Sequence, residues 1–113
     1  MKACLAVLLA SCCAAAVSPA IAGTQTGTVK DVYIRDSDGL ILVNLAGTHS
    51  ARPACALLTY WAIPNETTDS GKRLYALLLA AQLSGRTVIV IGKDTCSRWP
   101  DGEDIDTVGV TSS

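Results

Sequence analysis

The sequence predicts a small, mainly β domain with one helix, arranged as a five-stranded Greek-key barrel. Five short segments are rich in the β-branched and apolar residues of strands, and a segment between the third and fourth has helical periodicity. Five strands with a helix between the third and fourth is the element order of the OB-fold. An α+β sandwich, with the helix packed on one face of a sheet, is the alternative.

Residues 1–22 have the composition of a secretory signal. An apolar run from Ala3 to Val17 follows one lysine, and the segment ends in Ala20-Ile21-Ala22, a small-x-small cleavage pattern. We therefore expect cleavage after Ala22, a single OB-fold-like domain over residues 23–113, and export to the bacterial periplasm or the cell exterior. No later apolar stretch reaches the length of a membrane span.

An alternative processing site lies inside the same segment. Leu9-Ala10-Ser11-Cys12 resembles a bacterial lipobox, and cleavage before Cys12 would leave a lipid-anchored protein. The apolar core before Cys12 is short, and the proline and alanines after it complete an ordinary signal. These features favour cleavage after Ala22.

The domain that remains is slightly acidic and keeps two cysteines. Its charge argues against binding of nucleic acid, which usually requires a basic face. In an exported chain of this size, Cys55 and Cys96 are expected to form a disulfide worth about 4 kcal/mol in the chain-entropy model. A metal-binding or reactive thiol pair is the alternative, but neither a CxxC spacing nor a neighbouring histidine supports it.

The first half of the domain is expected to form a hairpin followed by a third strand. Gly23–Thr28 is small and polar and is expected to fray, whereas Val29–Arg35 favours a strand. Asp36–Gly39 supplies the turn, because glycine accepts the positive φ of tight hairpins, and Leu40–Leu45 is the return strand. The turn also resembles the start of a calcium loop, but the later ligands are absent. Ala54–Ile63 is almost continuously apolar and predicts a strand buried on both faces.

One helix is expected over residues 70–84. A residue in the range 68–70 can cap its first turn, and Gly85 occupies the position after the last turn that favours glycine. Four apolar residues at i, i+3, i+4 and i+7 define a core-facing stripe. They are Leu74, Leu77, Leu78 and Ala81. Leu79 and Leu83 fall on the far side of this stripe, where either a loop covers them or a partner subunit contacts them; we favour a homo-oligomer interface.

Two strands and an acidic segment complete the domain. Arg86–Lys93 and Ile105–Val110 predict the fourth and fifth strands, with a loop over Asp94–Glu103 between them. In the barrel, the third strand starts and the fourth ends at the same end, which would bring Cys55 and Cys96 together. Paired carboxylates in this region could in principle do acid-base chemistry or bind calcium, but we expect a solvated acidic segment. They are Asp101, Glu103, Asp104 and Asp106.

The remaining residues do not assemble a catalytic set. His49 is the only histidine and lies in a polar loop, where we expect it to be solvated. Adjacent Tyr60 and Trp61 must point to opposite faces of their strand, so one is expected in the core and the other outside. Trp99, in a polar loop before Pro100, is the better candidate for a contact surface. The alternative is that Trp99 closes the end of the barrel beside the disulfide.

Several short motifs run through most of the domain. They are Gly27-Thr28-Val29, Pro53-Ala54-Cys55, Trp61, Leu74-Tyr75-Ala76-Leu77, Gly85-Arg86-Thr87-Val88 and Trp99-Pro100. Together they resemble a family of small exported bacterial proteins that is distantly similar to the B subunits of subtilase cytotoxin and typhoid toxin. The resemblance implies an OB-fold, pentameric rings and binding of sialylated glycans, with Thr26 near the position of a sugar-holding hydroxyl residue. The chain differs from those subunits in its aliphatic helix end, Leu77–Ser84, and in the partner of Cys55.

We therefore expect an exported, non-enzymatic binding module that recognises a glycan or a protein partner and can self-associate. The candidate binding residues are Trp99, Trp61, Tyr60 and Thr26. The alternative function is a structural or envelope-associated protein without a small-molecule ligand, lipid-anchored if Cys12 is used. No cofactor, metal or nucleic acid is expected.

Overall fold

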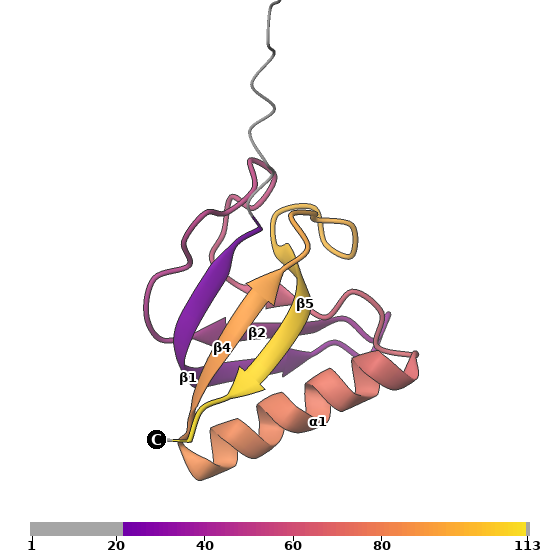
Figure 1. The fold of residues 1–113 in the computed structure, drawn as a ribbon. Coiled ribbons are helices and arrows are strands. Elements are labelled where there is room, and N and C mark those ends of the chain that lie inside the picture. The colour runs from indigo at the N-terminus through magenta and orange to yellow at the C-terminus, as the bar shows by residue number, and fades with distance from the viewer. Residues whose placement is uncertain (1–21, 113) are drawn as a thin grey trace, which may run out of the picture.

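The computed structural model describes residues 22–112, which form a closed five-stranded barrel with one helix (Figure 1). The strands neighbour one another in the order β1-β2-β3-β5-β4, and β4 pairs with β1 to close the ring. The elements are β1 (Thr24–Ile34), β2 (Ile41–Leu45), β3 (Trp61–Ala62), α1 (Asp69–Ser84), β4 (Thr87–Gly92) and β5 (Glu103–Val110). The predicted OB-fold-like order is confirmed, and the closed barrel excludes the α+β sandwich. The signal segment and the lipobox Cys12 lie outside the described residues, apart from Ala22.

Strand β1 is longer than predicted and pairs on both sides of the barrel. Its first half pairs with β4, from Thr24 opposite Ile91 to Thr28 opposite Thr87, and its second half pairs with β2. The register with β2 shifts between Val29 and Asp31, and an added Cβ at Gly27 would lie 2.0 Å from the Ala46 carbonyl oxygen. The expectation that residues 23–28 fray is therefore wrong, because residues 24–28 pair with β4 as a regular antiparallel strand.

The hairpin turn between β1 and β2 forms as predicted. Gly39 has φ +75°, and its N–H donates to the Arg35 carbonyl at 2.8 Å. The Arg35 N–H in turn donates to the Leu40 carbonyl at 2.9 Å. The positive φ explains why glycine occupies this position.

The third strand is much shorter than the predicted Ala54–Ile63. Only Trp61–Ala62 pairs as a strand, antiparallel to β2 and parallel to β5, and the preceding residues form a loop. The Arg52 guanidinium donates to the carbonyls of Ala56 and Leu57, so those acceptors are satisfied within the loop. Leu57 is consequently 75% exposed instead of buried in a sheet.

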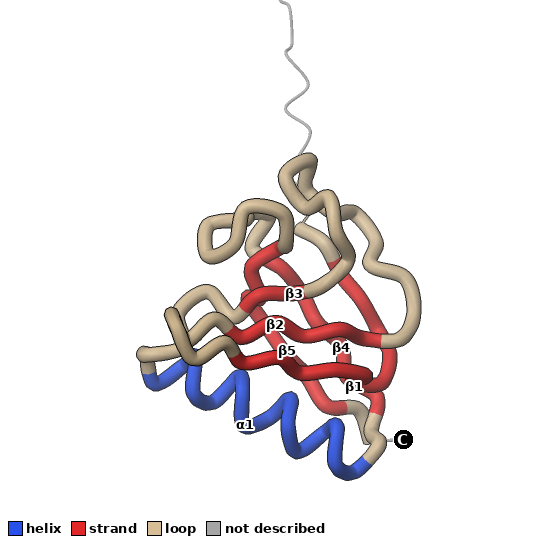
Figure 2. Tube along the Cα trace, turned by 180° about the vertical axis from the view of Figure 1, so that it is seen from behind, coloured by secondary structure: helices blue, strands red, loops and turns tan. Residues whose placement is uncertain are grey.

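Helix α1 lies across one end of the barrel, opposite the loops that join β2 to β3 and β4 to β5 (Figures 1 and 2). The Thr68 hydroxyl accepts from the Gly71 N–H at 3.1 Å, and Gly85 ends the helix with φ +66°, so both predicted caps are present. Leu78 and Ala81 are buried against the barrel, whereas Leu77 of the predicted stripe is 38% exposed. The buried core comprises Val29, Ile41, Val43, Leu45, Trp61, Ile63, Leu78, Ala81, Val88, Val90 and Ile105.

The predicted disulfide joins Cys55 to Cys96, with 6.1 Å between their Cα atoms. It connects the loop before β3 to the loop after β4, as the barrel order requires. Strand β5 begins at Glu103, two residues earlier than predicted. Over residues 22–112, the one helix is too short and too polar to cross a membrane.

Candidate functional site

The turn after β1 and the loop after β4 meet on the surface of the barrel. The guanidinium carbon of Arg35 lies 4.5 Å from the centre of the Trp99 ring, within the range of a cation–π contact. Trp99 is half-buried and lies outside the hydrophobic core. It is therefore neither fully exposed nor part of the barrel core. In OB-folds these two loops flank the ligand-binding face, which makes this contact the starting point for a site.

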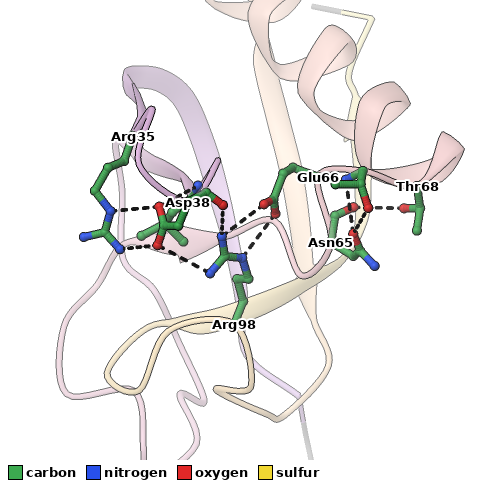
Figure 3. Close-up of polar contacts among 8 residues, drawn as sticks. Arg35, Asp38, Asn65, Glu66, Thr68 and Arg98 are labelled. Atoms are coloured by element: carbon green, nitrogen blue, oxygen red, sulfur yellow. Dashed lines mark hydrogen bonds and ion pairs between the residues drawn. The ribbon is translucent and has the colours of Figure 1, made fainter.

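A chain of ion pairs and hydrogen bonds runs from Arg35 through Asp38 and Arg98 to Glu66 (Figure 3). Asp38 accepts from the Arg35 Nε at 2.9 Å, and Arg98 donates to the Asp38 carbonyl at 2.9 Å. Arg98 also binds both carboxylate oxygens of Glu66, at 3.1 and 3.0 Å. We call Arg35, Asp38, Glu66, Arg98 and Trp99 the rim cluster. It joins three segments that are distant in sequence: the β1–β2 turn, the loop before α1 and the β4–β5 loop.

The carboxylates of the rim cluster are held in their ionised forms. The hydrogen bonds from Arg98 are the largest influence on Glu66 and set its pKa below the usual value. The Arg35 guanidinium holds the pKa of Asp38 well below its usual range. The side chains of Arg35 and Asp38 are 44% and 36% exposed, so this part of the cluster remains open to solvent.

A buried carboxylate fixes the loop that carries Trp99. Asp104 is fully buried, and its Oδ2 accepts from the Thr95 hydroxyl at 2.7 Å and the Ser97 N–H at 2.8 Å. Its Oδ1 accepts from the Arg98 N–H at 3.2 Å. Burial is the largest influence on Asp104 and opposes ionisation, but the hydrogen bonds from Ser97, Thr95 and the backbone outweigh it, so the pKa is lowered. Asp104 therefore shapes the loop as a buried anion.

A second polar cluster lies inside the barrel, and His49 belongs to it. The expectation of a solvated His49 is wrong, because its side chain is fully buried and its ring stacks on Trp61 at 3.9 Å between centroids. Trp61 donates its indole N–H to Gln25 at 2.8 Å, and the Gln25 amide donates to three backbone carbonyls near the start of the β2–β3 loop. His49 also contacts Glu103, 2.9 Å from its Nε2. We call Gln25, His49, Trp61 and Glu103 the buried network.

The hydrogen bonds of His49 locate a proton. Its Nδ1 lies 3.0 Å from the Thr59 carbonyl, which can only accept, so Nδ1 carries a hydrogen. One further proton must then lie between Nε2 and the Glu103 Oε1 for that contact to be a hydrogen bond. Both side chains have no exposed surface, so no substrate can reach them in this conformation. The buried network is accordingly structural.

The structure separates the four predicted binding residues. Trp61 is fully buried in the core, so its prediction as a binding residue is corrected; it presents no surface to a partner. Tyr60 is half-buried, and an added Cβ on Gly102 would lie 2.3 Å from its ring. Thr26 is exposed in the half of β1 that pairs with β4, and none of the contacts within residues 22–112 joins it to the rim cluster. Trp99 alone belongs to that cluster.

The expected acidic segment is not a solvated one. Glu103 and Asp104 are fully buried, and only Asp106 of the four carboxylates is exposed. In the part of the chain that the structure describes, no group of three or more His, Cys, Asp or Glu side chains is arranged to hold a metal ion.

A groove of about 510 Å³ is lined by residues outside the rim cluster. It lies between the loop before α1, the start of α1 and β5, and its lining includes Asn65, the neighbour of Glu66. Arg73 and Lys93 give the groove two cationic groups, opposed by Asp106. Sequence reasoning missed both the groove and four members of the rim cluster, although the arginine beside the Asp-Gly turn was a local signal.

Comparison with protein-family models, curated proteins and solved structures gives no match to this chain.

Proposed function

We propose that this chain is an exported binding module that recognises a glycan through the rim cluster. The half-buried indole of Trp99, with the Arg35 guanidinium over its ring, carries this proposal. Sugar rings stack on indole faces, and charged groups beside the ring supply directional hydrogen bonds. The ion pairs of Asp38, Glu66 and Arg98 hold these groups in place before binding, which lowers the entropic cost of association.

The groove beside the start of α1 favours an acidic glycan as the ligand. Arg73 and Lys93 line it beside the amide of Asn65, and a sugar carboxylate is a suitable partner for such cations. The resemblance to toxin B subunits supports the same choice, since those subunits bind sialylated glycans.

A glycan array with the oxidised, purified domain tests this proposal. We expect retention of sialylated or other acidic glycans, and a loss of at least about tenfold in affinity for Trp99→Ala, as for a central aromatic contact. Leu57→Ala is the matched control, because Leu57 is 75% exposed in the β2–β3 loop and outside the rim cluster. No retained glycan, together with localisation to the cell envelope, would instead support a structural role.

Self-association is a second proposed property, and the outer face of α1 supports it. Leu83 is 82% exposed, and Leu79 one turn earlier is half-buried. Ala76 and Ala80 complete an apolar stripe with them at helical spacing. Light scattering after size-exclusion chromatography should show an oligomer that Leu83→Glu dissociates. A strict monomer at micromolar concentration contradicts this part of the proposal.

Export is the third part of the proposal. The signal-like residues 1–22 support it, and the Cys55–Cys96 disulfide is compatible with an oxidising compartment.

A further inference from the structure

We propose that Gly23 is the N-terminal residue of the mature protein and that its α-ammonium group is seated on the buried carboxylate of Glu103. This inference goes beyond ligand recognition and rests only on the proposed export. It assigns a maturation step to the barrel: removal of the leader creates a charged group inside the fold.

Glu103 is a buried acid with few partners. Its side chain has no exposed surface, and its polar contacts within residues 22–112 are His49 Nε2 at 2.9 Å, the Gly23 N–H at 3.0 Å and the Asp94 N–H at 3.1 Å. His49 is the one titratable side chain among them, and Asp94 contributes only its backbone amide. An ammonium in place of the neutral Gly23 N–H would add a charge-assisted hydrogen bond to this carboxylate, beside its contact with His49.

Gly23 is already in the position that such a cation requires. Its nitrogen donates to Glu103 Oε2, and its carbonyl accepts from the Gly92 N–H at 2.9 Å, so the residue is fixed at both ends. An added Cβ at Gly23 would lie 2.0 Å from Glu103 Oε1 and 2.8 Å from His49 Nε2. A larger residue here would displace the Glu103 carboxylate from its present position.

The expected cleavage site coincides with this nitrogen. Cleavage hydrolyses the peptide bond between Ala22 and Gly23: the water oxygen becomes the second oxygen of the new Ala22 carboxylate, and the two water hydrogens end on the Gly23 nitrogen, which becomes an ammonium. The precursor offers Glu103 a neutral amide, whereas the mature chain offers a positive charge at the same position. Charge-assisted hydrogen bonds are roughly twice as strong as neutral ones, so cleavage should raise the stability of the folded barrel.

The pH dependence has a definite sign. Pairing with Glu103 favours the charged form of the Gly23 amino group, whereas burial opposes it. The proposal requires pairing to dominate, so that the amine titrates above about 7.7–8.0, the ordinary range for an α-amino group. The added stability is therefore fully present below about pH 7.7. It is lost as the pH rises through the raised value in the folded state.

Three measurements test the inference. First, the full chain is exported from a bacterial host and its intact mass is determined; the expected mass begins at Gly23 and includes one disulfide. A mass that begins at any other residue, including a lipidated Cys12, overturns the proposal. A negative glycan array leaves this result unaffected, so the two proposals fail independently.

Second, two oxidised chains spanning residues 23–113, which include every strand and the helix of the barrel, are compared by thermal unfolding. One has a free amine and the other an acetylated amine, which keeps the Gly23 N–H and removes its charge. At pH 6 we expect the free-amine chain to unfold about 4 °C higher or more, a difference that disappears at alkaline pH. Equal unfolding temperatures at pH 6, or a difference independent of pH, overturn the proposal. Nitrogen-15 NMR measures the pKa of the Gly23 amine directly in the folded chain. A pKa at the ordinary value of an α-amino group also overturns the proposal.

Discussion

The guanidinium of Arg35 lies over the indole of Trp99, with 4.5 Å from its carbon to the ring centre. This contact connects the turn after β1 to the loop after β4, two segments that the ladder of strands does not pair. Arg98 adds a second connection through the Asp38 carbonyl at 2.9 Å. The surface around Trp99 is thus formed by side chains of two loops. A cation–π contact and a hydrogen bond from a guanidinium connect these loops.

The two tryptophans should differ in fluorescence. Trp61 is fully buried and Trp99 half-buried, so acrylamide should quench mainly the emission of Trp99. In Trp99→Phe we expect a blue-shifted spectrum that resists quenching. Steady-state spectra of the wild type and this variant measure the effect. An unchanged quenchable fraction in Trp99→Phe would show that the assignment of the two environments is incorrect.

Two glycines near the ends of neighbouring strands should respond oppositely to alanine. An added Cβ at Gly92 would lie 1.8 Å from Glu103 Oε2 and 2.9 Å from the Trp61 ring, whereas nothing lies within 4 Å of one at Gly109. We expect Gly92→Ala to lower the free energy of unfolding by about 1–3 kcal/mol, as overpacking does. Gly109→Ala is the matched control and should be neutral or stabilising by up to about 1 kcal/mol. Urea unfolding of both variants measures the difference, and equal effects would contradict the packing of Glu103 on Gly92.

Acid should destabilise the fold through Glu66 and Asp104. Both have pKa values lowered in the folded state. Their contributions are present above the unfolded values of about 4.3 and 3.9, and are lost as the pH falls through the folded values. Denaturant unfolding between pH 6 and pH 2 should therefore show a stability that declines below about pH 4.5.

Asp104→Asn tests the part of this acid dependence that comes from Asp104. The amide cannot accept all the bonds from Thr95, Ser97 and Arg98, so we expect a loss of about 2 kcal/mol at neutral pH and a shallower decline in acid. Asp106→Asn, on an exposed neighbour, should stay within about 0.5 kcal/mol of the wild type. An acid profile unchanged by Asp104→Asn would rule out this anion as the source.

The disulfide should contribute strongly to stability and little to the shape of the Trp99 loop. Cys55 and Cys96 are separated by 41 residues, and replacing both with alanine should lower the free energy of unfolding by about 4 kcal/mol. Asp104 still holds Thr95 and Ser97 on either side of position 96, so the glycan binding that we propose for the rim cluster should persist. Urea unfolding and the glycan array measure the two effects. Loss of binding in a folded double variant would show that the disulfide itself sets the loop conformation.

Local signals in the sequence were sufficient for the order of elements. The Asp38-Gly39 turn, the Thr68 cap and Gly85 each act within a few residues, and all three form as expected. The length of β3 was not predictable in this way. Apolar residues such as Leu57 resemble a buried strand, but the Arg52 guanidinium takes up the loop carbonyls.

The polar clusters were beyond sequence reasoning for a different reason. His49 and Glu103 are 54 residues apart, and Glu66 and Arg98 are 32 apart. No periodicity relates such positions; only closure of the barrel brings them together. Glu103 and Asp104, which the sequence suggested were solvated, are therefore fully buried in the fold.

The division of β1 between two partners also has a consequence for when the chain can fold. Thr24 pairs with Ile91, so the first residues of the barrel have no strand partner until β4 has been made, and the ring cannot close before then. Before β4 has formed, the first half of β1 lacks its partner and leaves an unpaired edge. Because such long-range pairing is slow, this protein should complete its fold only after release of the whole polypeptide. The edge of β1, which could otherwise pair with another chain, is then paired with β4 inside the closed barrel.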